Sequence, residues 1–148
     1  MVKNVFKKLG KKQKNNKGFS LVELIVVIAI MAVLVGVLAP QLIKYVEKSR
    51  EATDIQTCDN IATALKTYYA DEEVAASVTV TLGKTELGTV ADTAVKDAGL
   101  TKAKIKGTKW TGDKITIVYN KADGTITYTG DSPYYHSDKD QFKKGPKS

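Results

Sequence analysis

The sequence predicts an α+β fold, in which a long N-terminal α-helix, kinked near Pro40, packs against a small antiparallel β-sheet head. Three observations predict it: an unbroken apolar run at Leu24–Ala39, a helical spacing of apolar residues after Pro40, and alternating runs in the second half of the chain. The 148 residues suffice for one domain of modest size. Hydrophobic residues make up 43% and charged residues 26%, which is globular composition.

The charge excess lies entirely in residues 1–18. The chain holds 23 Lys/Arg and 16 Asp/Glu, a net charge of +7, and seven of the lysines precede Gly18, whereas no acid precedes Glu23. The chain after Gly18 is therefore formally neutral. A nucleic-acid surface would need basic residues spread over the folded head, so nucleic-acid binding is disfavoured. Lysines directly before an apolar run instead indicate a cytoplasmic flank.

The apolar run is long enough to cross a membrane. Leu24–Ala39 contains no polar side chain, and the run extends back to Phe19 with only Ser20 and Glu23 as interruptions. At about 1.5 Å per residue, a helix from Phe19 to Ala39 matches the roughly 30 Å hydrocarbon core. A cleaved secretory signal would be shorter and end in a small-residue cleavage site. A plain signal anchor fits the length, but it leaves the carboxylate of Glu23 without a partner in apolar surroundings.

The helix is predicted to continue to Asp71, for about 50 residues in all. Pro40 removes one backbone donor and can kink the helix without ending it. Charged residues, including the pairs Lys44–Lys48 and Glu47–Glu51, are expected on the solvent face. The opposite face carries an apolar stripe with spacings of 3, 4, 3 and 4, formed by Ile55, Cys58, Ala62, Leu65 and Tyr69.

Alternation predicts the strands of the head. Val78–Leu82, Lys114–Asn120 and Thr125–Thr129 alternate, with Asp123-Gly124 as the turn of a hairpin, and Ala103–Trp110 is a candidate further strand. Thr89–Gly99 is predicted as a short helix capped by Thr89 and stopped by Gly99. Trp110 and Tyr69 are expected in the core, and Tyr134-Tyr135 is expected to dock the tail on the head.

These patterns divide the chain into five parts. They are a basic leader (1–18), an apolar half of the helix (19–40), an amphipathic half (41–73), a globular head with an antiparallel sheet (74–131) and a polar C-terminal tail (132–148). The tail holds Pro133, Gly145 and Pro146, so it is expected to lack regular structure.

One short segment carries a specific motif. Lys17–Glu23 joins the end of the basic leader to the apolar run. Lys17 and Gly18 end the leader, Phe19 follows, and Glu23 is the fifth residue after Gly18, before a long apolar helix. Pro40 is the twenty-second residue after Gly18. This ordered set resembles the processing site of type IV prepilins and related pseudopilins, and the resemblance extends from Met1 to about Ile55.

The resemblance implies the fate of the chain. A prepilin peptidase, which is also an N-methyltransferase, would cut the membrane-inserted precursor between Gly18 and Phe19 and methylate Phe19. Phe19, Glu23 and Pro40 would then serve assembly, with Glu23 paired to the Phe19 ammonium of a neighbouring subunit. The product would be a homo-oligomeric pilus at the cell surface, built by a pilus assembly machinery and used in adhesion, motility, aggregation or DNA uptake.

Two other functions stay open, and catalysis is not expected. A pseudopilin of a secretion or competence system would share the motif, and a signal-anchored extracellular binding protein would keep its N-terminus. No nucleophile–base pair, phosphate loop or metal motif occurs, so no enzyme, cofactor or metal is expected. Cys58 is the single cysteine, expected to be a small buried hydrophobe, and His136 is the single histidine, expected to be exposed. Asp71-Glu72-Glu73 lacks a calcium loop. Without a cysteine pair, packing alone is expected to hold the head.

Overall fold

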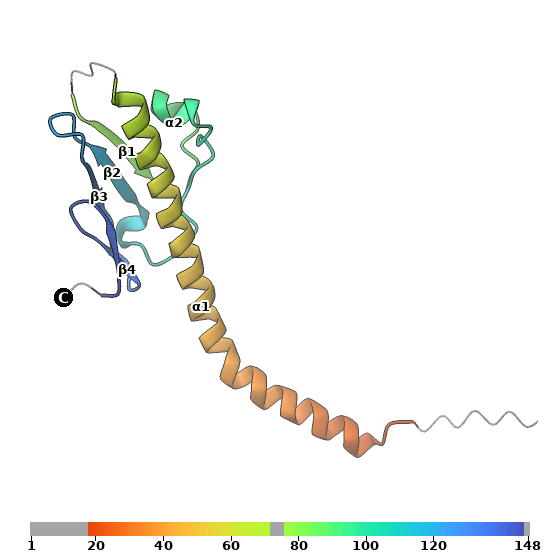
Figure 1. Cartoon of the computed structure of the whole chain (residues 1–148). Coiled ribbons are helices and arrows are strands. Elements are labelled where there is room, and N and C mark those ends of the chain that lie inside the picture. Colours follow the sequence, from red (N-terminus) through yellow and green to blue (C-terminus); the bar gives the residue numbers. More distant parts are fainter. Residues whose placement is uncertain (1–17, 72–75, 147–148) are drawn as a thin grey trace, which may run out of the picture. The chain divides into compact units, whose positions relative to one another are not determined.

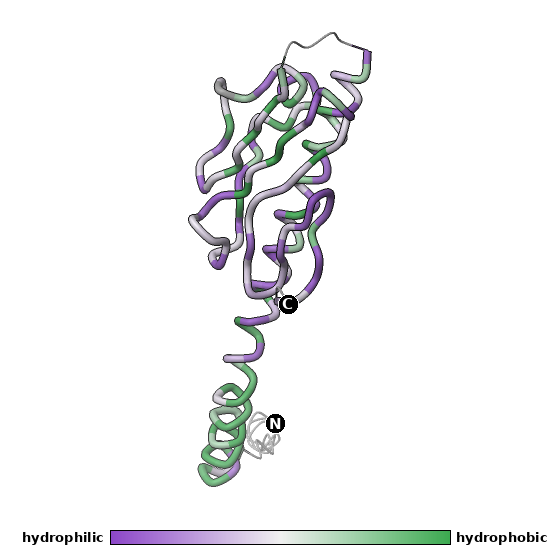
Figure 2. Tube along the Cα trace, turned by 90° about the vertical axis from the view of Figure 1, so that its left-hand side faces the viewer, coloured by the Kyte–Doolittle hydropathy of each residue, from purple (hydrophilic) through white to green (hydrophobic). Residues whose placement is uncertain are grey.

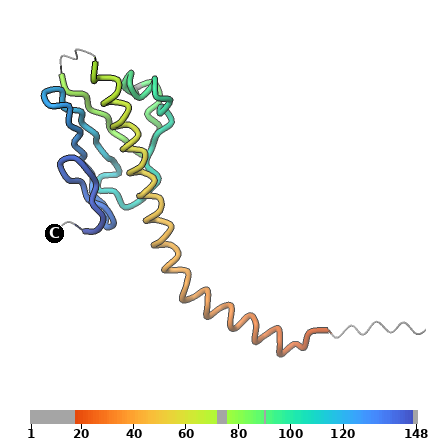
Figure 3. The backbone as a smooth tube through the Cα atoms, viewed as in Figure 1, coloured from red at the N-terminus to blue at the C-terminus, as the bar shows by residue number. Residues whose placement is uncertain are grey.

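The computed structural model describes residues 18–71 and 76–146, so most of the leader and residues 72 and 73 lie outside the described residues. The chain divides into two compact units, residues 1–40 and residues 41–148. The second unit holds the globular head, in which later segments return alongside the C-terminal half of a long helix (Figures 1 and 3).

The long helix α1 runs from Leu21 to Tyr69, 49 residues, as predicted. It continues through Pro40, and the kink at that residue stays a prediction. Within the second unit, one face of α1 is buried in the core. Four of the five predicted stripe residues are buried on this face: Cys58, Ala62, Leu65 and Tyr69. The fifth, Ile55, is partly buried, and Ile61, which was not predicted, is buried as well.

The head contains a three-stranded antiparallel sheet in the order β1-β2-β3. Strand β1 spans Val78–Leu82, β2 spans Ile115–Tyr119 and β3 spans Ile126–Thr129. Alternate residues face the core, as the period-two pattern predicted, and cross-strand pairs such as Val80 with Ile117 fix the register. The predicted hairpin between β2 and β3 is confirmed, and Gly124 adopts the left-handed φ of 70° that its turn requires.

The predicted helix at Thr89–Gly99 is shorter than expected. A 3₁₀ turn at Gly88–Val90 precedes helix α2, Thr93–Asp97. The cap is Asp92 rather than Thr89, because the Asp92 carboxylate accepts a 2.9 Å hydrogen bond from the Ala94 amide. Gly99 stops the helix as predicted, with a φ of 72°.

Two expectations about the rest of the head were wrong. Ala103–Trp110 is not a strand, and it leads into a 3₁₀ turn at Thr111–Asp113. The tail contains a hairpin of β4, Tyr135–Ser137, and β5, Phe142–Lys144. This β4–β5 hairpin is held by packing, since the Phe142 ring lies 5.7 Å from the Trp110 ring and 4.7 Å from the Tyr128 ring. Tyr135 packs partly buried against the core, as the docking prediction required, and His136 is only half-exposed.

The solvent face predicted for Glu47 and Glu51 was also wrong. Both residues are buried, Glu47 with 8% and Glu51 with 0% of the residue's surface exposed, and so is Asp54 at 1%. Their spacings of four and three residues place these carboxylates on one face of α1, continuous with Cys58. We call Glu47, Glu51 and Asp54 the acidic row.

The acidic row explains why Ala103–Trp110 forms no strand. Asp54 accepts hydrogen bonds from the backbone amides of Lys106 and Gly107, both at 2.7 Å, and from the Trp110 indole at 2.8 Å. Glu47 accepts from the amide and the hydroxyl of Thr108. These carboxylates take the backbone donors that Ala103–Trp110 would need to pair with a neighbouring strand. The same hydrogen bonds link the head to α1, so the head is not held by packing alone, as had been expected.

The remaining core residues follow the sequence-based expectation. Trp110 is buried, and Tyr69 packs in the core while its hydroxyl donates to the Asp92 carboxylate. Cys58 is fully buried, and that burial, reinforced by the charges of Asp54 and Asp59, raises the pKa of its thiol. The thiol therefore stays protonated and inert.

Candidate functional site: the N-terminal segment

The predicted processing bond lies just before α1. Gly18, Phe19 and Ser20 precede the helix in non-helical backbone and are exposed, Phe19 by 91% of its surface. A Cβ atom added to Gly18 would meet nothing within 4 Å, so the described residues leave space around this bond. An exposed bond in non-helical backbone is one that a peptidase can reach.

The start of the helix is a capping box formed by Ser20 and Glu23. The Ser20 amide donates to Oε2 of Glu23 at 2.9 Å, and the Val22 amide donates to Oγ of Ser20 at 3.3 Å. Each residue thus satisfies a backbone donor that the first helical turn leaves without a partner. The negative charge also lies at the positive end of the helix dipole.

Ser20 is the site residue that the sequence reasoning missed. Its signal was present, since serine followed three residues later by glutamate before an apolar run is the sequence signature of a capping box. The missed cap changes the view of Glu23, because this carboxylate has a hydrogen-bond donor within its own chain and need not be unpartnered before assembly.

The structure brings Gly18, Phe19 and Glu23 together at one end of α1, with Pro40 further along inside the same helix. Between Leu21 and Leu38 the large apolar residues are about half exposed or more. The hydropathy colouring of Figure 2 shows this part of the chain as predominantly hydrophobic. By length and composition this part of α1 is apolar enough to cross a membrane. An apolar surface around a whole helix needs lipid or protein around it.

Comparison with known proteins identifies this segment. A family model described as "Prokaryotic N-terminal methylation motif" matches residues 13–39, which include the predicted processing bond, the capping box and most of the apolar run. The chain is type IV pilin-like. The matched residues begin before the start of α1 and end one residue before Pro40, so the motif concerns the N-terminal segment and not the head.

A relative agrees with this identification. The pilin-like chain is 41% identical over 73 residues to "Prepilin peptidase-dependent protein A" of Clostridium perfringens (strain 13 / Type A), a match that covers 47% of this chain and 51% of the relative. The chain thus spans about half the length of the curated relative it matches. No solved structure matches this chain.

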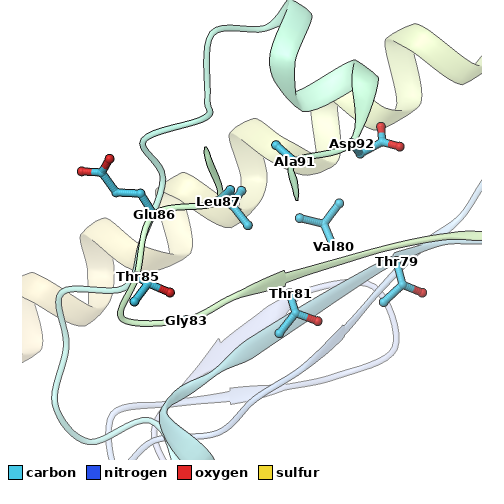
Figure 4. A pocket seen from close by; sticks show the side chains of 9 residues that line it. All are labelled: Thr79, Val80, Thr81, Gly83, Thr85, Glu86, Leu87, Ala91 and Asp92. Atoms are coloured by element: carbon cyan, nitrogen blue, oxygen red, sulfur yellow. The ribbon is translucent and has the colours of Figure 1, made fainter. Parts of the chain in front are cut away.

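The head offers no comparable chemical site among the described residues. An open cleft of about 470 Å³ lies beside β1, where Val80 points toward Leu87 and Ala91 while Thr79 and Thr81 point to the other side of the strand (Figure 4). Its carboxylates have partners: Glu86 pairs with Lys104 at 3.6 Å, and Asp92 caps α2. No group of three or more His, Cys, Asp or Glu residues within the described ranges could hold a metal ion.

Proposed function

We propose that this chain is a structural subunit of a type IV pilus-like extracellular filament. It would enter the cytoplasmic membrane as a single-pass precursor, lose residues 1–18 and polymerise through its N-terminal helix. The observation that carries the proposal is the exposed Gly18–Phe19 bond, placed directly before a capped helix whose first half exposes apolar residues all round. The name of the clostridial relative, a prepilin peptidase-dependent protein, supports cleavage of this chain by the same class of enzyme.

Cleavage would create a new α-amine on Phe19, which the same enzyme would methylate. A methylated amine still carries a proton at neutral pH, so it remains a cation. Glycine before the bond adds no side-chain bulk for a peptidase working at the membrane surface. The lysines of the leader would hold this end of the chain in the cytoplasm.

Glu23 would fix the register of one subunit on the next. Its hydrogen bond from Ser20 uses Oε2, and a carboxylate has acceptor capacity for further donors, so Oε1 can accept from the Phe19 ammonium of a neighbouring subunit. A buried ion pair contributes little net stability because desolvation opposes it, but it specifies which arrangements are allowed. The apolar surface around it suits lipid before assembly and helix packing afterwards.

Two alternatives predict different products. A pseudopilin would share the processing but build a short envelope-spanning filament, and the absence of a cysteine pair from the sequence favours a pilus slightly. A signal-anchored binding protein would keep Met1 and would not polymerise. Both the pilus and the pseudopilin are structural roles without catalysis.

Filament yield from Glu23 variants tests the proposal. The variant Glu23→Val should insert and accumulate in the membrane, while sheared filaments should fall about tenfold or more, since each lost bond to a charged group is worth about 1.5–3 kcal/mol. Ser20→Ala is the matched control, because it removes one cap bond and leaves the carboxylate in place. Normal filament yield from Glu23→Val would show that Glu23 does not direct assembly.

A further inference from the structure

Glu51 is the member of the acidic row with the poorest hydrogen bonding. Its side chain is fully buried, and Oε2 accepts a 2.6 Å hydrogen bond from the Ser132 hydroxyl. Oε1 is also buried and has no hydrogen-bond partner among the described residues. Asp54, three residues further along α1, instead receives donors on both oxygens.

The surroundings of Glu51 cannot easily adapt to a negative charge. A Cβ added to Gly107 would lie 2.6 Å from Cγ of Glu51, so the backbone of that loop packs directly on the side chain. The neighbouring acids on α1, Glu47 and Asp54, add repulsion, and the guanidinium of Arg50 pairs with Glu47 at 3.8 Å rather than with Glu51.

These surroundings favour the neutral acid. Burial raises the pKa of Glu51, and the charges of Glu47 and Asp54 raise it further. The Ser132 hydroxyl and the backbone amide of Lys109 favour the ionised form and offset part of that rise, although the amide makes no hydrogen bond to Oε1. The proton therefore stays on Glu51 to a higher pH than on an ordinary glutamate.

Ser132 connects Glu51 to the β4–β5 hairpin. Its hydroxyl accepts hydrogen bonds from the amides of Tyr134 and Tyr135 at 3.2 and 3.1 Å while donating to Glu51. Its own amide donates to the Tyr135 carbonyl at 2.6 Å. A change at Glu51 is therefore transmitted through one serine to the first residue of β4.

We propose that Glu51 is a pH-sensitive latch: neutral Glu51 keeps the β4–β5 hairpin docked on α1, and ionised Glu51 releases it. When the proton leaves Glu51 for water, a buried carboxylate remains with one oxygen lacking a donor, which is costly in an apolar interior. Opening the hairpin admits water to that oxygen. Docking is thus tightest below the pKa of an unfolded glutamate and weakens as the pH rises through the raised pKa of the docked state.

The latch does not depend on polymerisation, so a test on the full chain in detergent micelles is independent of the proposed filament. Trp110, the chain's single tryptophan, reports on it, because its buried ring contacts Phe142 of β5. Quenching of Trp110 by acrylamide should increase severalfold between about pH 5 and pH 9 in the wild type. Glu51→Gln, which mimics the neutral acid, should show the same low quenching throughout.

Two further variants keep the test decisive. Glu47→Gln should retain the pH-dependent increase but shift it to lower pH, since Glu51 is still present and has lost one of the charges that raise its pKa. Ser132→Ala should give high quenching at every pH, because it cuts the connection to β4. A wild type whose quenching does not change with pH, or a Glu51→Gln variant that retains the change, would overturn the latch.

Discussion

Replacing Asp54 by alanine should remove the strongest polar link between the head and α1. The carboxylate accepts two backbone amides at 2.7 Å and the Trp110 indole at 2.8 Å while only 1% of Asp54 is exposed. The variant Asp54→Ala leaves all three donors without this acceptor. Two of them, the amide of Gly107 and the indole, are buried away from water.

The expected loss is large for a single polar residue. A hydrogen bond to a charged group contributes about 1.5–3 kcal/mol, and each buried donor left without a partner costs about 1–3 kcal/mol. Three bonds are not additive, and removal of the carboxylate also ends its own desolvation cost. We therefore expect a loss of about 3–5 kcal/mol in the free energy of unfolding. Asp54→Asn should lose less, since one amide oxygen can still accept.

Urea unfolding of the full chain in detergent micelles measures this loss. Near-ultraviolet circular dichroism of the tyrosines is the signal, because the environment of Trp110 changes in the variant itself. Asp97→Ala is the control, since Asp97 is an exposed carboxylate at the end of α2, and it should stay within about 0.5 kcal/mol of the wild type. A loss below about 1 kcal/mol for Asp54→Ala would refute the view that the acidic row holds the head.

Three further predictions follow from the same region. Gly107→Ala should lower the free energy of unfolding by about 1–3 kcal/mol, because its methyl group would overlap Glu51, while Gly83→Ala, which meets nothing within 4 Å, should be nearly neutral in the same urea titration. Burial alone would raise the pKa of Glu47, but the hydrogen bonds from Thr108 outweigh burial, so the pKa is lowered. The stability that Glu47 contributes is therefore present above the pKa of an unfolded glutamate and is lost as the pH falls. Glu47→Gln should flatten the acid side of a profile of melting temperature against pH. Phe142→Ala should cost about 1–2 kcal/mol by the same unfolding measurement, because a half-buried ring would lose two aromatic partners.

Local pattern predicted the regular elements well. The length of α1, strand β1 and the β2–β3 hairpin follow from periodicity and from a turn glycine, all of which are properties of neighbouring residues. The strand prediction for Ala103–Trp110 failed because the hydrogen-bond partners of this segment lie far away in the sequence, on α1, where no local pattern indicates them.

The prediction that the acidic row faces solvent failed for a different reason. Glu51 and Asp54 continue the spacing of the apolar stripe toward the N-terminus, so periodicity alone would have placed them on the buried face, whereas the prediction put Glu51 in solvent. Their residue type instead indicated exposure to solvent, because carboxylates are rarely buried unless donors surround them. The donors come from a loop whose path the sequence does not reveal.

The N-terminal site was accessible to sequence reasoning because it is contiguous. Gly18, Phe19 and Glu23 lie within one short segment, and the chemistry expected of them needs no distant partner in the same chain. The capping role of Ser20 belongs to the same segment, and a check for serine followed by glutamate at the third position would have revealed it.

Mass spectrometry of material sheared from the cell surface examines cleavage, methylation and assembly in one experiment. We expect a polymer of chains that begin at Phe19, carry a methyl group on the terminal nitrogen and lack residues 1–18. Surface protein that retains Met1 and the leader, and that is recovered as single chains, would contradict cleavage and assembly together.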